Sequence, residues 1–113
     1  LINLGYKQIN ANCVFEEGMI TTIEPGIYIE GSHGIRVENE ILCKKGAFNE
    51  YGQFMEFETI TFAPIDLDAI EISLLNDEEK NWLNNYHQTV YDTLHDYLTD
   101  EELDWLRAYT RRI

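Results

Sequence analysis

The first part of the chain alternates apolar and polar residues in a pattern that predicts β-strands. Residues 1–17 are mixed and polar and predict mainly loop. Met19–Glu24 and Ile27–Ile29 are rich in β-branched residues, and Pro25-Gly26 separates them. The most regular strand is predicted over residues 35–44, a polar connection over residues 46–53, and a further strand over residues 54–63. In the 35–44 strand, alternation places one set of side chains on each face: Ile35, Val37, Ile41 and Cys43 against Arg36, Glu38, Glu40 and Leu42.

After Pro64 the apolar spacing becomes helical. Asn76 followed by three acidic residues is a helix start, and Thr99 with Glu102 has the spacing of a capping box. Between these signals, large apolar residues recur at helical spacing: Trp82, Leu83, Tyr86, Val90, Leu94, Tyr97 and Leu98. We expect the first five of them to be mostly buried, either against the sheet or against a second copy of the chain. A second, shorter helix is predicted over residues 100–113.

The predicted elements define an α+β fold with an antiparallel sheet followed by helices. The 113 residues suffice for one domain or a large part of one, with a β-rich part at residues 1–73 and a helical extension at residues 74–113. The sequence opens on Leu1 without a methionine, so we expect it to be part of a longer chain. No apolar run approaches the length of a membrane span, and none resembles a signal peptide.

The charge balance narrows the range of partners. The formal net charge is −13, from 21 acidic and 8 basic residues, and such a chain repels phosphates. Nucleic acid and anionic membranes are therefore not expected as partners. Cys13 and Cys43 lack a CxxC spacing, which favours a reduced, cytoplasmic setting over a disulfide framework.

Two glutamates stand at unusual places in the predicted strands. Glu24 ends a strand against Pro25-Gly26, and Glu38 follows Arg36 within the most regular strand. If the strands are neighbours, the two carboxylates approach each other and repel unless a cation lies between them. Oxygen ligands of this kind suit Mn²⁺, Mg²⁺ or Zn²⁺. On spacing alone, solvent-facing positions or salt bridges from Glu38 to Arg36 or Lys44 remain the stronger interpretation.

The sequences of these strands resemble those of one enzyme family. The runs "GMITTIEPGIY" and "GIRVENEILC", continued by "FMEFETITFAPI" and "WLNNYH", resemble the pita-bread metallopeptidases of the aminopeptidase P (Xaa-Pro aminopeptidase) type. The resemblance implies that the chain is the C-terminal part of a pita-bread catalytic domain. It implies that Glu24 is a metal ligand that also transfers protons, and that Glu38 bridges two metal ions. Arg36 and Tyr28 would shape and support the site. For His33, a contact with substrate and a plain loop position remain alternatives.

The same resemblance implies a cofactor, a substrate and partners. The family's site holds two divalent metal ions, Mn²⁺ being expected here with Zn²⁺ or Co²⁺ as alternatives, and cleaves the bond before a proline at the second position of a peptide. Its five protein ligands include two aspartates and a histidine that should precede Gly18, whereas residues 1–17 contain no Asp or His. We therefore expect the isolated chain to be inactive. A homodimer in the cytoplasm is also expected.

Other interpretations remain open at this point. The chain could be a non-catalytic protein-binding module of pita-bread fold, although the retention of both glutamates argues against a degenerate site. It could also be an acidic interaction domain in which the motif is coincidental. His33 is expected in a loop near the site mouth, and His87 and His95 are expected to be solvated or to face a dimer partner.

Overall fold

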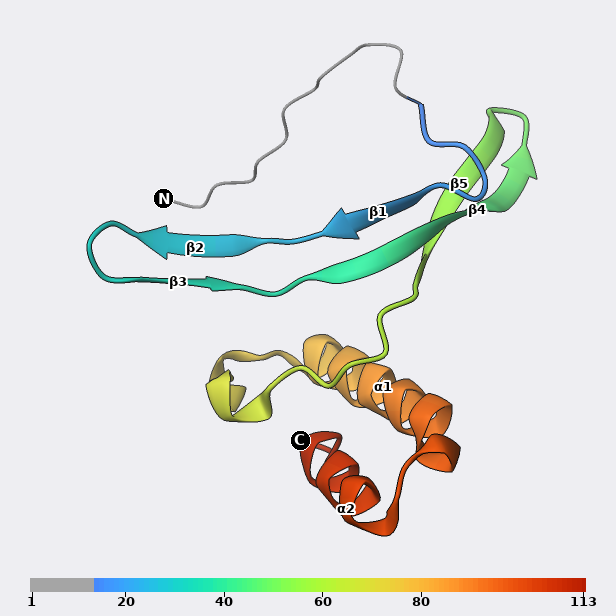
Figure 1. The fold of residues 1–113 in the computed structure, drawn as a ribbon. Helices are drawn as coiled ribbons and strands as arrows, with labels where there is room; N and C mark the ends of the chain where they lie inside the picture. Colours follow the sequence, from blue (N-terminus) through green and yellow to red (C-terminus); the bar gives the residue numbers. More distant parts are fainter. Residues whose placement is uncertain (1–13) are drawn as a thin grey trace. The chain divides into compact units, whose positions relative to one another are not determined.

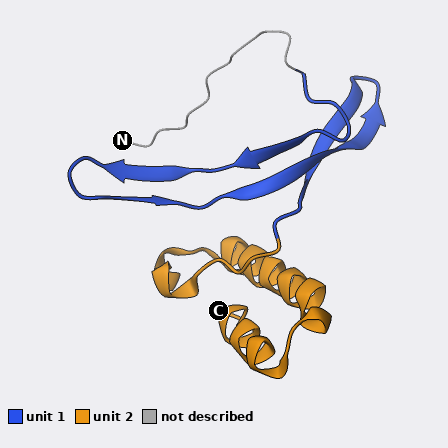
Figure 2. Ribbon diagram, in the orientation of Figure 1, with its two compact units in different colours: residues 1–61 blue, residues 62–113 orange. Residues whose placement is uncertain are grey.

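A computed structural model describes residues 14–113, and the chain divides into two units between Thr61 and Phe62. Every described strand lies in the first unit and every described helix in the second (Figure 2). This order of antiparallel strands followed by helices is the α+β arrangement predicted from the sequence. The division into parts at residues 1–73 and 74–113 stays a prediction.

The strands of the first unit form two antiparallel sheets (Figure 1). One is a three-stranded sheet of order β1–β4–β5, and the other pairs β2 with β3. The strands are β1 Ile20–Ile23, β2 Gly26–Ile29, β3 His33–Arg36, β4 Asn39–Asn49 and β5 Gly52–Thr59.

A single register runs from the β1–β4 pair into the β2–β3 pair. Ile23 faces Asn39 where β1 pairs with β4, and Gly26 faces Arg36 where β2 pairs with β3. Between these pairs, the Val37 N–H donates to the Pro25 carbonyl at 3.2 Å. Pro25 has no N–H to return, so the ladder is interrupted while the strands stay adjacent. The β1–β4 and β2–β3 ladders therefore belong to one long β-hairpin, which turns at residues 30–32.

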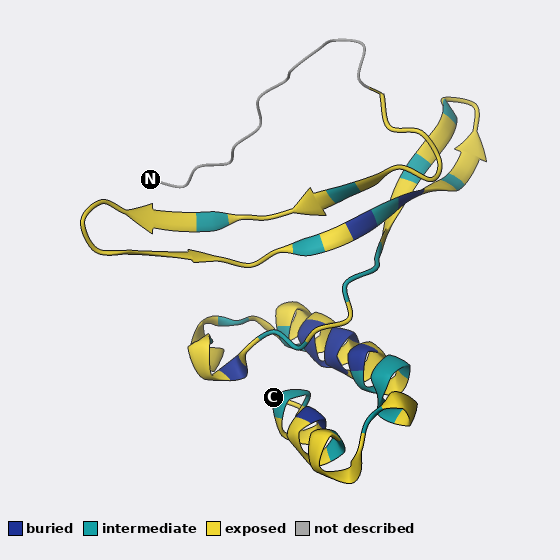
Figure 3. Ribbon diagram, viewed as in Figure 1, coloured by how far each residue is buried: buried dark blue, intermediate teal, exposed yellow. Residues whose placement is uncertain are grey.

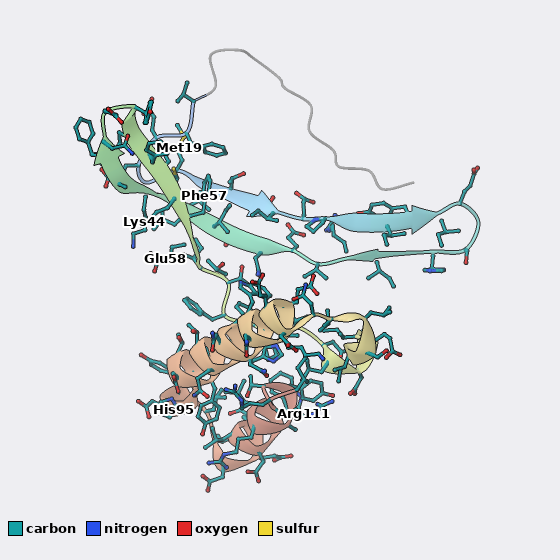
Figure 4. The ribbon with its side chains drawn as sticks, turned by 180° about the vertical axis from the view of Figure 1, so that it is seen from behind. Met19, Lys44, Phe57, Glu58, His95 and Arg111 are labelled. Atoms are coloured by element: carbon teal, nitrogen blue, oxygen red, sulfur yellow. The ribbon has the colours of Figure 1, made fainter. Side chains whose placement is uncertain are left out.

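Two of the strand predictions were wrong in detail. The run over residues 35–44 is broken at Val37 and Glu38, which lie opposite Pro25 and Glu24. The expected polar connection at residues 46–53 is instead a tight hairpin between β4 and β5, in which Asn49 faces Gly52. Within this segment Phe48 faces Gln53, so the two strands continue almost to the turn. Further along the same strands, Lys44 and Glu58 form an ion pair at 2.8 Å (Figure 4). Polar side chains alone therefore do not distinguish an exposed strand from a loop.

The second unit is helical, and both predicted helix starts are confirmed. Its helices are α1 Asp77–Leu94 and α2 Asp100–Tyr109, with three short 3-10 helices at Leu67–Ala69, Ile72–Leu74 and His95–Tyr97. Asn76 accepts the Glu79 N–H at 2.9 Å, and Glu79 accepts the Asn76 N–H at 2.9 Å. Thr99 and Glu102 form the equivalent capping box of α2. None of the helices in the described range could cross a membrane.

The core of the second unit lies along α1 (Figure 3). Its buried members are Leu67, Leu83, Tyr86, Val90 and Leu106. Burial is thus confirmed for three of the five residues expected to be mostly buried, and Leu94 is half-buried at the edge of this core. Trp82 is 54% exposed in the single chain, so it is not buried within this unit, and its burial against a second copy stays a prediction. Its ring stacks on Tyr86 at 5.5 Å between centroids, at the margin of the apolar stripe.

His87 is the clearest correction in this unit. It was expected to be solvated or to face a partner, but its side chain is only 1% exposed. The Ile65 N–H donates to His87 Nε2 at 3.0 Å, which satisfies the buried ring. Position 87 lies one turn after Leu83 and one turn before Val90, so it shares the buried face of α1. His95 is partly exposed and contacts the carbonyls of Tyr91 and Asp92.

The first unit has little core of its own. Within residues 14–61, Ile41 and Cys43 are the buried apolar residues. Cys43 is a free thiol, and Cys13 lies outside the described residues. Strands β2 and β3 are mostly exposed (Figure 3). The hairpin therefore leaves both its faces accessible, and the face that carries the candidate site is the polar one.

Candidate metal centre

Glu24 and Glu38 are a cross-strand pair. The register that sets Ile23 opposite Asn39 places Glu24 opposite Glu38, one position further toward the turn. Because Pro25 and Val37 form a hydrogen-bonded pair, the neighbouring glutamates occupy a non-hydrogen-bonded position. In such a position side chains come closest, with Cβ atoms about 4.5–5.5 Å apart. The structure thus brings together the two carboxylates that the sequence singled out.

Arg36 lies between the two carboxylates. Its Nη1 is 3.3 Å from Glu24 Oε2, and its Nη2 is 3.0 Å from Glu38 Oε2. All three side chains are about half exposed, at 49%, 47% and 39% for Arg36, Glu24 and Glu38. The Glu38 charge, a hydrogen bond to Tyr28 and the Glu24 charge raise the pKa of Arg36 above its ordinary value. A charged guanidinium therefore offsets part of the repulsion between the facing glutamates.

Tyr28 belongs to the same face and contacts the same guanidinium. Alternation along the strands places Glu24, Gly26 and Tyr28 on one face, opposite Glu38, Arg36 and Gly34 respectively. Arg36 has no acceptor, so it donates in its hydrogen bond to the Tyr28 oxygen. The structure therefore gathers four of the five predicted site residues.

His33 is the fifth, and the structure does not bring it to the carboxylates. It begins β3 opposite Ile29, in the alternate set of positions from Gly34, Arg36 and Glu38. Its exposed ring lies 2.8 Å from the Ser32 hydroxyl through Nδ1. A contact with substrate through His33 stays a prediction.

Thr22 is a member of the site that the sequence analysis missed. Its hydroxyl donates to Glu24 Oε1 at 2.8 Å, while the other oxygen of Glu24 faces Arg36. Both oxygens of this carboxylate are thus held. The alternation along β1 could have found Thr22, since it lies two residues before Glu24 on the same face.

The donor set fits a hard divalent cation in kind. Two ionised carboxylates facing each other supply oxygen ligands, the type that Mn²⁺ and Mg²⁺ prefer. With Arg36 between them the three groups still carry one net negative charge. Two ligands are too few to hold a metal ion, and residues 14–113 contain no group of three or more His, Cys, Asp or Glu side chains arranged to do so. Glu24 and Glu38 could hold an ion only together with ligands from elsewhere.

Together, the fold and the site describe a class of protein: an α+β protein that carries a pair of carboxylates, a candidate metal site, on an antiparallel hairpin. The chain belongs to metallopeptidase family M24. The model of this family matches residues 3–45, and the model of the C-terminal region of peptidase M24 matches residues 53–113. The first match contains both glutamates, and the second contains β5 from its second residue onward and both α-helices.

Individual relatives agree with this assignment. Human Xaa-Pro aminopeptidase 2 is 36% identical over 103 residues, which are 88% of this chain and 15% of the human protein. Protein pid-5 of Caenorhabditis elegans is 37% identical over 110 residues, which are 93% of this chain and 10% of that protein. The chain thus spans a small part of the length of the relatives it matches.

A solved structure gives the same result. It is an X-prolyl aminopeptidase from Caenorhabditis elegans, described as a cytosolic enzyme with a di-nuclear active site. The TM-score is 0.72 at 33% identity, over 88% of this chain and 17% of the other. The predicted pita-bread fold class is thereby confirmed.

Proposed function

We propose that this chain is the C-terminal portion of a dinuclear metalloaminopeptidase that hydrolyses the bond between an N-terminal residue and a following proline. The observation that carries the proposal is the facing pair Glu24–Glu38 in a chain of family M24. The di-nuclear site of the solved relative supports two metal ions. Two carboxylates cannot fix two ions alone, so the chain needs further ligands and is inactive in isolation.

Each residue of the site has a distinct part in this proposal. Glu38 would hold both ions and Glu24 one of them. Glu24 would also accept a proton from the attacking water and return it to the departing nitrogen, a role that requires a carboxylate beside the scissile bond. The Thr22 hydroxyl and Arg36 fix the orientation of Glu24. When bound, the metal ions polarise the scissile carbonyl and activate the attacking water.

The finer features of the proposal rest on the ligand chemistry, the relatives and the exposed apolar side chains. Mn²⁺ is the proposed metal because the ligands of this chain are carboxylates. The proposed substrate is a peptide with proline second, as the names of the relatives suggest. Cytoplasmic location is supported by the cytosolic relative. A homodimer is supported by the half-exposed rings of Trp82 and Trp105, which offer apolar surface to a partner.

The test supplies the missing ligands from the solved relative. In a chimera, the matching segment of the Caenorhabditis elegans enzyme is replaced by this chain. We expect the Mn²⁺-loaded chimera to hydrolyse an Xaa-Pro peptide, and Glu38→Gln to lower turnover by about 100-fold or more. Glu40→Gln is the matched control, because Glu40 is an exposed glutamate two residues further along the strand.

Three outcomes would overturn the proposal. One is turnover by the chimera that Glu38→Gln leaves unchanged, and another is a folded, metal-loaded chimera without turnover. The third is turnover by the isolated 113-residue chain that survives repurification and disappears in Glu38→Ala. The last result would mean that this chain completes the site by itself. A folded but inactive chimera would instead favour a non-catalytic module.

A further inference from the structure

The Tyr28 ring lies against two glycines on the polar face of the hairpin. A Cβ added to Gly34 would lie 2.7 Å from Tyr28 Cδ1. A Cβ added to Gly26 would lie 2.7 Å from the Tyr28 hydroxyl oxygen. Gly34 faces Tyr28 across the strands, and Gly26 precedes it by two residues on the same strand. The ring thus runs diagonally over space that any other residue type would fill.

Backbone conformation does not explain these glycines. Among the described residues, positive φ occurs at Gly18, Gly31 and Gly52, and not at Gly26 or Gly34. Other residues could adopt the backbone of β2 and β3 at both positions. What both glycines provide is the absence of a side chain beneath an aromatic ring, so their role lies in the placement of Tyr28.

The ring position determines where its hydroxyl lies. With the hydroxyl above Gly26, it is beside Arg36, which faces Gly26 across the strands. Arg36 donates to this oxygen and, through its two terminal nitrogens, contacts Glu24 and Glu38. A long arginine on an exposed ribbon has many rotamers, and a third partner on the side away from the acids restricts them.

We propose that Gly26 and Gly34 are positioning residues that seat the Tyr28 ring, and that the seated ring holds the Arg36 guanidinium between Glu24 and Glu38. This device deepens the proposed function, on which its use in a metal site rests, because it fixes the arginine that orients both carboxylates. The device itself acts within the hairpin and needs no bound ion. The proposal gives a role to Gly34, which lies opposite Tyr28 and not opposite Glu24 or Glu38.

The experiment is a double-mutant cycle in the 113-residue chain, with the solvent exchange rate of the Arg36 Nε–H measured by ¹⁵N NMR. We expect Gly34→Ala to speed this exchange about three- to fivefold, because the displaced ring no longer accepts from the guanidinium. Tyr28→Phe should do the same, since it keeps the ring and removes the oxygen. In a Tyr28→Ala background, Gly34→Ala should have no further effect, as the nearest remaining atom is the Ile27 carbonyl at 3.5 Å.

Gly46→Ala is the matched control. Gly46 also lies in a strand without positive φ, and an added Cβ would meet its nearest atom at 3.4 Å, away from Tyr28. It should leave Arg36 exchange unchanged. Gly34→Ala alone could unfold the chain. Folding of the Tyr28→Ala/Gly34→Ala variant would then support the proposed role of Gly34, because only the clash with the Tyr28 ring has been removed.

The proposal is overturned if Gly34→Ala or Tyr28→Phe leaves Arg36 exchange unchanged in a folded chain. It is also overturned if Gly34→Ala retains its full effect, on exchange or on folding, when Tyr28 is Ala. Neither result bears on whether the chimera is an aminopeptidase, because no metal and no substrate enters the measurement. Failure of the seat and failure of the proposed function are therefore distinguishable.

Discussion

At the scale of single residues, the site is an arrangement of charges that would be unfavourable without its arginine. Glu24 and Glu38 face each other at the closest position of an antiparallel pair, where like charges destabilise the pairing. Arg36 contacts both, and Thr22 takes up the remaining oxygen of Glu24. The Arg36 guanidinium is thus a cation that belongs to the hairpin itself. Any metal ion that binds the glutamate pair enters a site already organised around this positive charge.

Removing that cation should loosen the hairpin at the glutamate pair. In Arg36→Gln we expect the Val37 N–H, which donates to Pro25, to exchange with solvent several-fold faster at neutral pH. The second substitution Glu38→Gln should restore slow exchange, because the repulsion is then gone. Lys44→Gln is the control, since it removes a paired lysine further along the sheet. The explanation fails if Arg36→Gln and the double variant exchange alike.

At the scale of elements, local signals and cross-strand signals differ in what they allow to be predicted. The starts of α1 and α2 were predictable because Asn76 and Thr99 bond groups three residues away. From spacing alone, the approach of Glu24 and Glu38 was one of several interpretations. The resemblance of the motifs around them to a known family favoured it. The Thr22 contact, the seat at Gly34 and the β4–β5 hairpin were not predicted, because each depends on a register that sequence spacing does not fix.

The capping box of α1 should contribute measurably to stability. In Asn76→Ala the Glu79 N–H loses its acceptor, and we expect the free energy of unfolding to fall by about 1 kcal/mol. Asn85→Ala, at an exposed position inside the same helix, should leave stability equal or slightly higher. Urea unfolding followed by circular dichroism at 222 nm measures both. Equal losses in the two variants would show that the cap is not the source of the effect.

Burial of His87 should make the helical unit sensitive to mild acid. Burial, together with the nearby Arg111 charge, lowers the pKa of His87 below its ordinary value of 6.5. The unfolded chain therefore binds a proton that the folded chain excludes. Stability is unaffected above about pH 6.5 and falls as the pH drops below it.

The measurement is the urea midpoint between pH 7.5 and 5. We expect the midpoint of the unsubstituted chain to fall across this range, and His87→Gln, which keeps an acceptor for the Ile65 N–H, to flatten the dependence. His95→Gln is the control, because it removes an imidazole from the end of the same helix without touching the buried bond. Identical profiles for the unsubstituted chain and His87→Gln would refute the assignment.

At the scale of the whole molecule, residues 14–113 hold an organised pair of candidate ligands, and a metal centre would need more of them. The chain spans 15% of the human relative and 17% of the solved one, and its first unit buries little apolar surface. Half-exposed apolar residues on the hairpin, such as Ile27 and Ile35, are consistent with a sheet that gains neighbours in a larger catalytic domain. In the proposed function, Glu24 and Glu38 complete a dinuclear centre in that domain.

The most direct test of that claim is the metal content of the chimera after Mn²⁺ loading and dialysis, measured by plasma mass spectrometry. We predict about two ions per chain in the chimera and in its Glu40→Gln variant, and one or none in Glu38→Gln, because the bridging carboxylate is then lost. Retention of two ions by a folded Glu38→Gln chimera would contradict the claim, since the centre would then form without this ligand.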